Sequence, residues 1–185
     1  MESEWKWDRL DPHERKVAEL LLQGKSNAAI CAEVFLSRAR VQECIKRMLI
    51  KAGVDSTRAA IALLVEERET MTLLRVLDQA SDGAVIIQDR VVKFFNKAML
   101  RAMGYELEEV VGTPFVEMVA PRSRSVQANN YDLRMQGEAF PGSYVATALC
   151  KDGQERKMLI TSGGLIRYAG RPAFLAIIVP HLSEE

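Results

Sequence analysis

A cluster of basic side chains lies between Arg38 and Lys51, where the chain has five Arg or Lys residues and one acidic residue, Glu43. Apolar residues in this window recur at helical spacing, which predicts a helix with one buried stripe and a charged opposite face. Long donors on such a face suit the phosphates and base edges of DNA. The candidate DNA-binding residues are Ser37, Arg38, Arg40, Gln42, Glu43, Lys46, Arg47 and Lys51.

Local capping signals predict the helices that must position this face. Asp11, Pro12 and Glu14 match an N-cap, a first-turn proline and a capping-box acid, so a first helix begins here and ends at Gly24. A short second helix follows, and residues 33–36 connect it to the basic helix. The remaining caps are predicted at Ser26, Ser37 and Gly53. A short helix that holds a longer one outward across a tight turn has the dimensions to place the longer one in a major groove.

The charge pattern alone leaves a second interpretation open. The exposed charges of the basic helix would then only solvate a surface helix, with Glu43 paired to Lys46 or Arg47 at helical spacing. The whole chain does not decide between the two, because its 185 residues contain 25 acidic and 25 basic side chains. The length favours two domains, each large enough for its own core.

Other chemistries find little support in the residue pattern. Cys31, Cys44 and Cys150 form no CxxC pair, and His13 and His181 lie far apart, so no metal-ligand spacing is present. No nucleophile stands beside a plausible base, and no glycine-rich phosphate loop follows a strand, so we do not expect an enzyme. The start MESEWKWDRL has no apolar signal run, and FLAIIV is too short to span a bilayer, which predicts a cytoplasmic protein.

The span LDPHERKVAELLLQGKSNAAICAEVFLSRARVQECIKRMLIKAGVDSTRAAI resembles the four-helix DNA-binding domain of LuxR-type bacterial regulators. LDPHE stands for the family's Leu-Thr-x-Arg-Glu, residues 24–30 for Gly-x-Ser-Asn-x-x-Ile, and residues 51–54 for Lys-Leu-Gly-Val. The resemblance implies binding to double-stranded DNA, with Lys46 at a family contact position. Arg40, Gln42 and Glu43 depart from the usual Thr-Val-Lys region, which predicts an altered or weak site preference.

A fourth helix is predicted from Asp55 or Ser56, and residues 66–80 read as a helical connector that continues it or breaks once. In the LuxR family the fourth helix is a dimer contact, and two-fold symmetry would set two recognition helices about 34 Å apart. The alternatives are packing onto its own domain and, for the connector, cover for the following sheet. The candidate dimerisation residues are Ile61, Leu64, Met71, Leu74 and Leu77.

The remaining sequence predicts an α+β domain with a five-stranded antiparallel sheet. AVIIQ and VVKFF form a hairpin around Asp89-Arg90, short helices follow, and SYVATALC, RKMLITSGGLIRY and AFLAIIV supply three more strands. We interpret Ser162-Gly163-Gly164 as a bulge within a strand. DGAVIIQDRVVKFFNKAMLRAMGYELEEVVGTPFVEMV and KDGQERKMLITSGGL resemble the two halves of a PAS domain, although the first hairpin turn lacks the usual glycine.

A PAS domain implies a pocket between the sheet and the short helices, filled by a small molecule or only by side chains. The resemblance supports neither a covalent flavin, because no Cys lies in an Asn-Cys-Arg-like helical motif, nor a His-ligated haem, because neither His lies on those helices. The cofactor is therefore left unassigned, and a small apolar ligand or none is expected. The candidate pocket residues are Met99, Met103, Met118, Ala148, Met158, Ile160 and Ile178.

The sequence therefore predicts an extension (1–9), a LuxR-type domain (10–65), a connector (66–80) and a PAS domain (81–181). The first functional hypothesis is a bacterial transcription regulator, a homodimer whose PAS domain senses a small molecule or mediates pairing. The alternative is a signalling adaptor that uses both domains to bind proteins and does not bind DNA.

Overall fold

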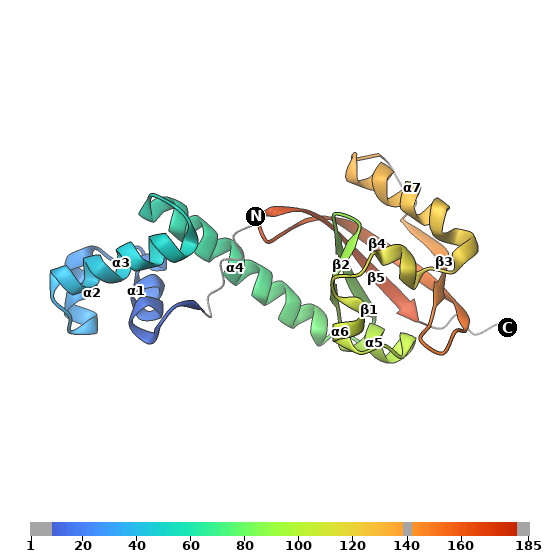
Figure 1. Ribbon diagram of the computed structural model, residues 1–185, viewed down its shortest axis with the longest axis horizontal. Coiled ribbons are helices and arrows are strands. Elements are labelled where there is room, and N and C mark those ends of the chain that lie inside the picture. Colours follow the sequence, from blue (N-terminus) through green and yellow to red (C-terminus); the bar gives the residue numbers. More distant parts are fainter. Residues whose placement is uncertain (1–8, 139–141, 181–185) are drawn as a thin grey trace. The chain divides into compact units, whose positions relative to one another are not determined.

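The computed structural model describes residues 9–138 and 142–180, and the chain divides into two compact units, residues 1–71 and 72–185 (Figure 1). The division falls inside the predicted connector. The first unit contains helices α1–α3 and the first part of α4: α1 Pro12–Leu22, α2 Asn27–Val34, α3 Arg38–Ala52 and α4 Thr57–Asp78. Among the described residues this unit has helices only, which confirms the all-α prediction.

The helix ends of the first unit follow the predicted caps. The Asp11 carboxylate accepts from the Glu14 N–H at 2.9 Å, and Glu14 in turn accepts from the Asp11 N–H at 2.8 Å, so the capping box is complete. Ser26 and Ser37 cap α2 and α3. Gly24 and Gly53 adopt positive φ after α1 and α3, where a side chain would be strained.

The connection between α2 and α3 is shorter than predicted. Residues 33 and 34 belong to α2, and the helix ends at Phe35, which adopts the left-handed conformation with φ 53°. The prediction of a connection from residue 33 was therefore wrong by two residues, because Phe35 ends the helix where glycine would be usual. The Phe35 side chain is 92% exposed.

Helix α4 begins at the cap residue Ser56, whose hydroxyl accepts from the Ala59 N–H at 3.2 Å, and is unbroken to Asp78. The alternative of a break in the connector is therefore wrong. In the first unit Ala60 and Leu64 are fully buried against α1–α3. In the second unit Leu77 is buried against the sheet, with Leu73 and Leu74 packed beside it.

The second unit contains the predicted five-stranded antiparallel sheet, and its strand order is β2-β1-β5-β4-β3 (Figure 1). Side chains alternate across it, so Val85 and Ile87 of β1 face one core cluster while Ala84 and Ile86 face the leucines of α4. The elements are β1 Gly83–Gln88, β2 Val91–Phe95, α5 Lys97–Met103, α6 Leu107–Val110, η2 Phe115–Met118, η3 Pro121–Ser123, α7 Arg124–Met135, β3 Ser143–Leu149, β4 Glu155–Tyr168 and β5 Arg171–Pro180.

The hairpin turn between β1 and β2 uses unusual residues. Asp89 and Arg90 both have positive φ between β1 and β2, which a two-residue hairpin requires and which glycine usually supplies. Tyr131 and Asp132 of α7 hold this turn, since the Tyr131 hydroxyl accepts from the Arg90 N–H at 3.4 Å and Asp132 pairs with the Arg90 guanidinium. The missing glycine is thus replaced by contacts with α7.

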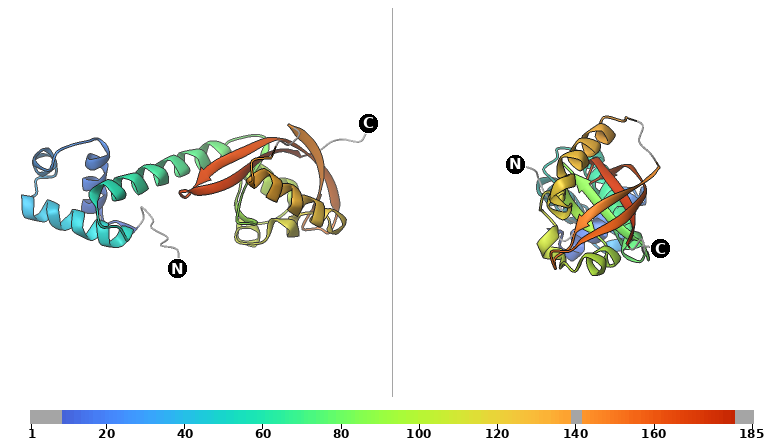
Figure 2. Two further views of the ribbon diagram at one scale, coloured as in Figure 1. Left: turned by 90° about the horizontal axis from the view of Figure 1, so that it is seen from above. Right: turned by 90° about the vertical axis from the view of Figure 1, so that its right-hand side faces the viewer.

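The predicted bulge in β4 is confirmed. The register between β4 and β5 shifts between Thr161 and Gly164, within the long twisted hairpin seen in Figure 2. A Cβ atom at Gly163 would lie 1.7 Å from the Leu175 carbonyl oxygen, so only glycine fits there. The close approach of the two backbones explains the residue type.

Asn96, fully buried between β2 and α5, joins three elements of the second unit. Its amide nitrogen donates to the carbonyls of Leu77 at 2.9 Å and Asp82 at 2.8 Å. Its amide oxygen accepts from the backbone N–H groups of Ala84 and Met99, both at 2.9 Å. The end of α4, the start of β1 and the first turn of α5 are therefore held by one side chain.

Replacing Asn96 by Ala would leave four backbone groups without this partner, and three of these hydrogen bonds are buried. We expect Asn96→Ala to lower the free energy of unfolding of the second unit by about 2–4 kcal/mol. A urea titration followed by the NMR signals of β1 and β5 measures this change. Asn129→Ala, which removes an exposed amide from α7, is the control and should leave the midpoint unchanged. Equal midpoints for the two variants would contradict the role given to Asn96.

Candidate nucleic-acid interface and ligand cavity

The exposed face of α3 carries a compact set of polar side chains. Val41, Cys44 and Met48 are buried in the first unit, so the opposite side of the helix faces solvent. Ser37 caps the helix, with its hydroxyl accepting from the Arg40 N–H at 3.4 Å. The exposed members of the predicted site are Arg38, Arg40, Gln42, Glu43, Lys46 and Arg47, with Ser37 at the helix start.

Arg47 and Lys51 have partners on α1. The Glu14 carboxylate is buried, and the Lys51 ammonium lies 2.5 Å from one of its oxygens while Arg47 Nε lies 3.4 Å from the other. Arg47 also lies 3.5 Å from Asp11, and Lys51 donates to the Arg9 carbonyl at 3.0 Å. The structure therefore places these two predicted DNA-binding residues in contacts that fix α3 on α1.

The capping hydrogen bonds also affect the Asp11 carboxylate. The Glu14 N–H and the nearby Arg47 charge hold the pKa of Asp11 below its usual value. Because the folded-state pKa is depressed, this contribution to stability is present above the unfolded value and is lost as the pH falls through the folded one. The Asp11 carboxylate therefore keeps its charge, and its contact with Arg47, at neutral pH.

Sequence reasoning missed the role of Glu14. The capping-box pattern identified it as an acid in the first turn, but nothing local showed that its carboxylate would be buried beside two cations from α3. The sequence feature that could have indicated this role is the spacing of Arg47 and Lys51, which are four residues apart and therefore lie on one side of a helix.

The predicted dimerisation residues lie in different surroundings. Leu64 is fully buried in the first unit, Ile61 packs against the same core, and Leu77 and Leu74 cover the sheet of the second unit. Met71 is 62% exposed. The first four residues thus contribute to their own units, and pairing through α4 stays a prediction.

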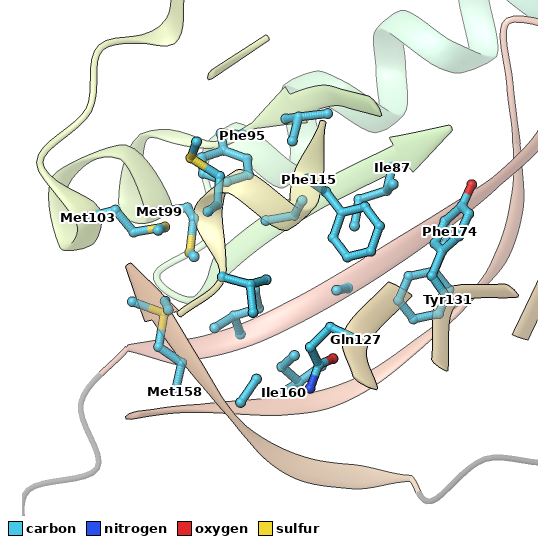
Figure 3. A pocket seen from close by; sticks show the side chains of 18 of the residues that line it. Ile87, Phe95, Met99, Met103, Phe115, Gln127, Tyr131, Met158, Ile160 and Phe174 are labelled. Atoms are coloured by element: carbon cyan, nitrogen blue, oxygen red, sulfur yellow. The ribbon is translucent and has the colours of Figure 1, made fainter. Parts of the chain in front are cut away.

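All seven predicted pocket residues line one cavity in the second unit, with a volume of about 90 Å³. The cavity lies between the inner face of the sheet and α5, η2 and α7. Figure 3 shows Met99, Met103 and Met158 toward one end and Gln127 and Tyr131 toward the other. The volume is well below the roughly 300 Å³ at which pockets for drug-sized ligands begin. The binding of a ligand there stays a prediction.

Polar residues at the second end of the cavity were missed by sequence reasoning. Gln127 and Arg134 of α7 and Tyr144 of β3 line the wall, and the Tyr144 hydroxyl donates to Gln127 Oε1 at 3.5 Å. Burial raises the pKa of Tyr144, and the nearby Arg134 charge opposes this shift. Gln127, Tyr131 and Arg134 recur at i, i+4 and i+7, a helical stripe that could have identified them.

Among the described residues, no cysteine or histidine lines the cavity. Cys150 is buried at the end of β3, and burial raises its pKa, so it is a poor nucleophile. His13 is exposed on α1, and His181 lies outside the described residues. Across 9–138 and 142–180, no group of three or more His, Cys, Asp or Glu side chains is arranged to hold a metal ion.

The contacts of Glu14 predict different effects for two lysines of α3. Lys51→Met should lower the free energy of opening α1 by about 2 kcal/mol, because the buried Glu14 carboxylate loses its closest cation. Amide hydrogen exchange at Val17–Leu21 would then accelerate about 30-fold. Lys46→Met, an equal change at an exposed position, is the control and should have little effect. Equal protection in the two variants would show that Lys51 does not stabilise α1.

Comparison with known proteins identifies the first unit. Residues 8–64 match the family model for bacterial regulatory proteins of the luxR family. This span includes α1–α3 and the start of α4, with the capping box and the exposed face of α3. A comparison with curated proteins gives no match.

Solved structures resemble the second unit. A LOV protein from Rhodobacter sphaeroides is 14% identical, with a TM-score of 0.50 over 60% of this chain and 66% of that one. A PAS domain from Desulfitobacterium hafniense is 16% identical, with a TM-score of 0.48 over 58% of this chain and 99% of that one. A PAS domain of an HTR-like protein from Haloarcula marismortui is 17% identical, with a TM-score of 0.46, over 60% and 91% of the two chains. At these identities the likeness concerns the fold. The chain therefore joins a helix-turn-helix domain of the luxR family, residues 8–64, to a second unit with the PAS fold.

Proposed function

We propose that the chain is a bacterial transcription regulator in which α3 binds double-stranded DNA and the PAS unit senses a small molecule. The observation that carries the proposal is the exposed set Arg38, Arg40, Gln42 and Lys46 on the third helix of a luxR-family domain. A helix-turn-helix domain of this family is a non-catalytic kind of domain, and we propose no enzymatic activity. Such a regulator would act in the cytoplasm, where bacterial DNA lies.

The contacts proposed for α3 divide into two kinds. Arg38, Arg40 and Lys46 would neutralise phosphates, a contribution that does not depend on sequence. Gln42 can bond the N6 and N7 edge of adenine, and Glu43 can accept from a cytosine amine. Because Glu43 also repels phosphates, the site would discriminate among sequences more than it adds affinity. Arg47 and Lys51 would support the helix from behind, through Glu14.

We propose a homodimer that pairs along α4. Two-fold pairing would place two recognition helices on successive major grooves. Since Leu64 and Leu77 are buried within their own units, the contact would depend on Met71 and on Val76, which is 60% exposed. Leu74 and Ile61, both partly buried, would lie at its margin.

A route from the cavity to α4 runs through Asn96. Met99 lines the cavity with its side chain, and its N–H donates to Asn96, which also holds the Leu77 carbonyl of α4. Lys97 adds a 2.6 Å ion pair with Asp78 at the end of α4. A shift of α5 on ligand binding would therefore act on the helix that continues into the first unit.

A second candidate function, a protein-binding adaptor without DNA affinity, is favoured by two observations. Glu43 is exposed on the face that would meet DNA, and Arg47 and Lys51 are engaged by carboxylates of α1. The net positive charge left on the face is small. Measurable affinity for duplex DNA would exclude this candidate.

None of the described helices is long and apolar enough to cross a membrane.

Lys46→Ala should weaken binding to duplex DNA about tenfold at roughly 50 mM salt. The variant neutralises one phosphate fewer, so binding releases fewer counterions from the DNA. Fluorescence anisotropy with a labelled duplex measures the affinity. Lys16→Ala, which removes a lysine from the exposed face of α1, is the matched control and should bind as the wild-type chain does. Unchanged affinity of the Lys46 variant would remove α3 from the interface.

Glu69→Pro tests α4 as the connection between sensing and DNA binding. Glu69 is exposed in the middle of α4, so proline there breaks the helix without removing a core side chain. We expect the DNA affinity to change by about fivefold or more relative to Glu69→Ala. Anisotropy titrations and the native mass of both variants provide the readout. Equal DNA affinity and equal dimer mass in the two variants would contradict the coupling.

A further inference from the structure

The walls of the PAS cavity differ chemically between its two ends. Methionines from α5 and β4 gather at one end, together with Phe95, and Figure 3 places Gln127, Tyr131 and Phe174 toward the other. Thioether and phenyl groups at the first end offer only apolar contacts. A ligand that matches the cavity therefore has an apolar body and one polar end.

Arg134 supplies the charge at the polar end. Its guanidinium carbon lies over the Phe174 ring, 4.9 Å from the ring centre, and over the Tyr144 ring, 4.7 Å from the ring centre, so both rings make cation–π contacts with it. Figure 3 shows Phe174 at the same end of the cavity as Tyr131. Because Arg134 contacts the Phe174 ring, Arg134 lies at this end too. Among the described residues that line the cavity, Arg134 is the charged one, and neither Asp nor Glu is present.

The two ring contacts limit how this cation can meet a ligand. Aromatic rings contact the faces of the guanidinium group, whereas its N–H donors point outward along its edge. A planar carboxylate meets such an edge with two parallel hydrogen bonds. Gln127 lies on the same wall, where its Oε1 accepts from the Tyr144 hydroxyl, and its amide N–H groups can donate to an oxygen of the same group. The positive charge and the donor set thus fit an anion better than an alcohol or an amine.

We propose that the cavity binds a small monocarboxylate with an unbranched apolar chain, its carboxylate at Arg134 and Gln127 and its chain among the methionines. This inference rests on the proposed sensing function and names its ligand class. The volume of about 90 Å³ favours a short chain. Methionine side chains rearrange easily, so Met99, Met103, Met118 and Met158 allow the chain to lengthen by a few methylenes.

The methionines also provide the assay. Hexanoate, hexan-1-ol and hexylamine, which share a chain and differ in the end group, are titrated into the full chain carrying ¹³C-methyl methionine. The methyl signals of Met99, Met103, Met118 and Met158 report on the cavity, and those of Met48 and Met71, which lie in the other unit, serve as internal controls. The comparison is repeated with Arg134→Gln and with the control Arg101→Gln, an exposed arginine of α5.

Hexanoate should shift the four cavity methyl signals with an affinity about tenfold or more above that of hexan-1-ol, and hexylamine should bind least. Arg134→Gln should remove the preference for hexanoate while leaving hexan-1-ol unchanged, and Arg101→Gln should change neither. Arg134→Lys keeps the charge without the planar edge and should retain part of the preference for hexanoate. This variant replaces Arg134→Gln in the test if the glutamine variant does not fold.

Two other results would overturn the inference in different ways. If hexanoate and hexan-1-ol bind the cavity equally, or if Arg134→Gln keeps the preference, the carboxylate assignment is wrong while sensing of an apolar molecule stands. If none of the three compounds shifts the cavity methyl signals, both the ligand class and the sensing role of this cavity are contradicted. Shifts at Met48 or Met71 alone would place binding elsewhere and count against the inference.

Discussion

The buried amide of Asn96 makes four hydrogen bonds to backbone groups of α4, the α4–β1 connection, β1 and α5. The buried groups among them would be costly to leave unpaired, so the three elements can occupy only arrangements in which Asn96 reaches all of them. The inner face of the sheet, the methionine wall of the cavity and the end of α4 are consequently fixed together. Both the cavity and its connection to the rest of the chain depend on this constraint.

In the first unit a buried carboxylate joins helices in the way that Asn96 joins elements of the second. Glu14 closes the capping box of α1 and also holds Lys51 and Arg47 of α3. A buried charge needs partners, so its two cations fix how α3 lies on α1. The same contacts withdraw two of the five basic side chains of α3 from the set proposed to face DNA. The proposed recognition surface is therefore smaller and closer to neutral than the sequence suggests.

The features that could be predicted from the sequence were set by neighbouring residues. The caps at Asp11, Ser26 and Ser37 and the bulge at Gly163 follow from short-range patterns, and the structure places each as expected. The methionines that line the cavity were expected only from the resemblance to a PAS domain. What could not be predicted depends on residues distant in sequence. Lys51 meets Glu14 across 37 positions. Arg134 makes cation–π contacts with Tyr144 and Phe174, and nothing local to α7 indicates those partners.

DNA binding by α3 is the central claim, and the salt dependence of binding tests it most directly. The wild-type chain is titrated with a duplex of random sequence over a series of salt concentrations. Three phosphate-neutralising side chains, Arg38, Arg40 and Lys46, predict that log K falls against log salt with a slope of about −2.7 for each bound chain. A measured slope near this value supports a regulator that holds DNA through the exposed face of α3. The absence of binding at low salt, or a slope near zero, would contradict it.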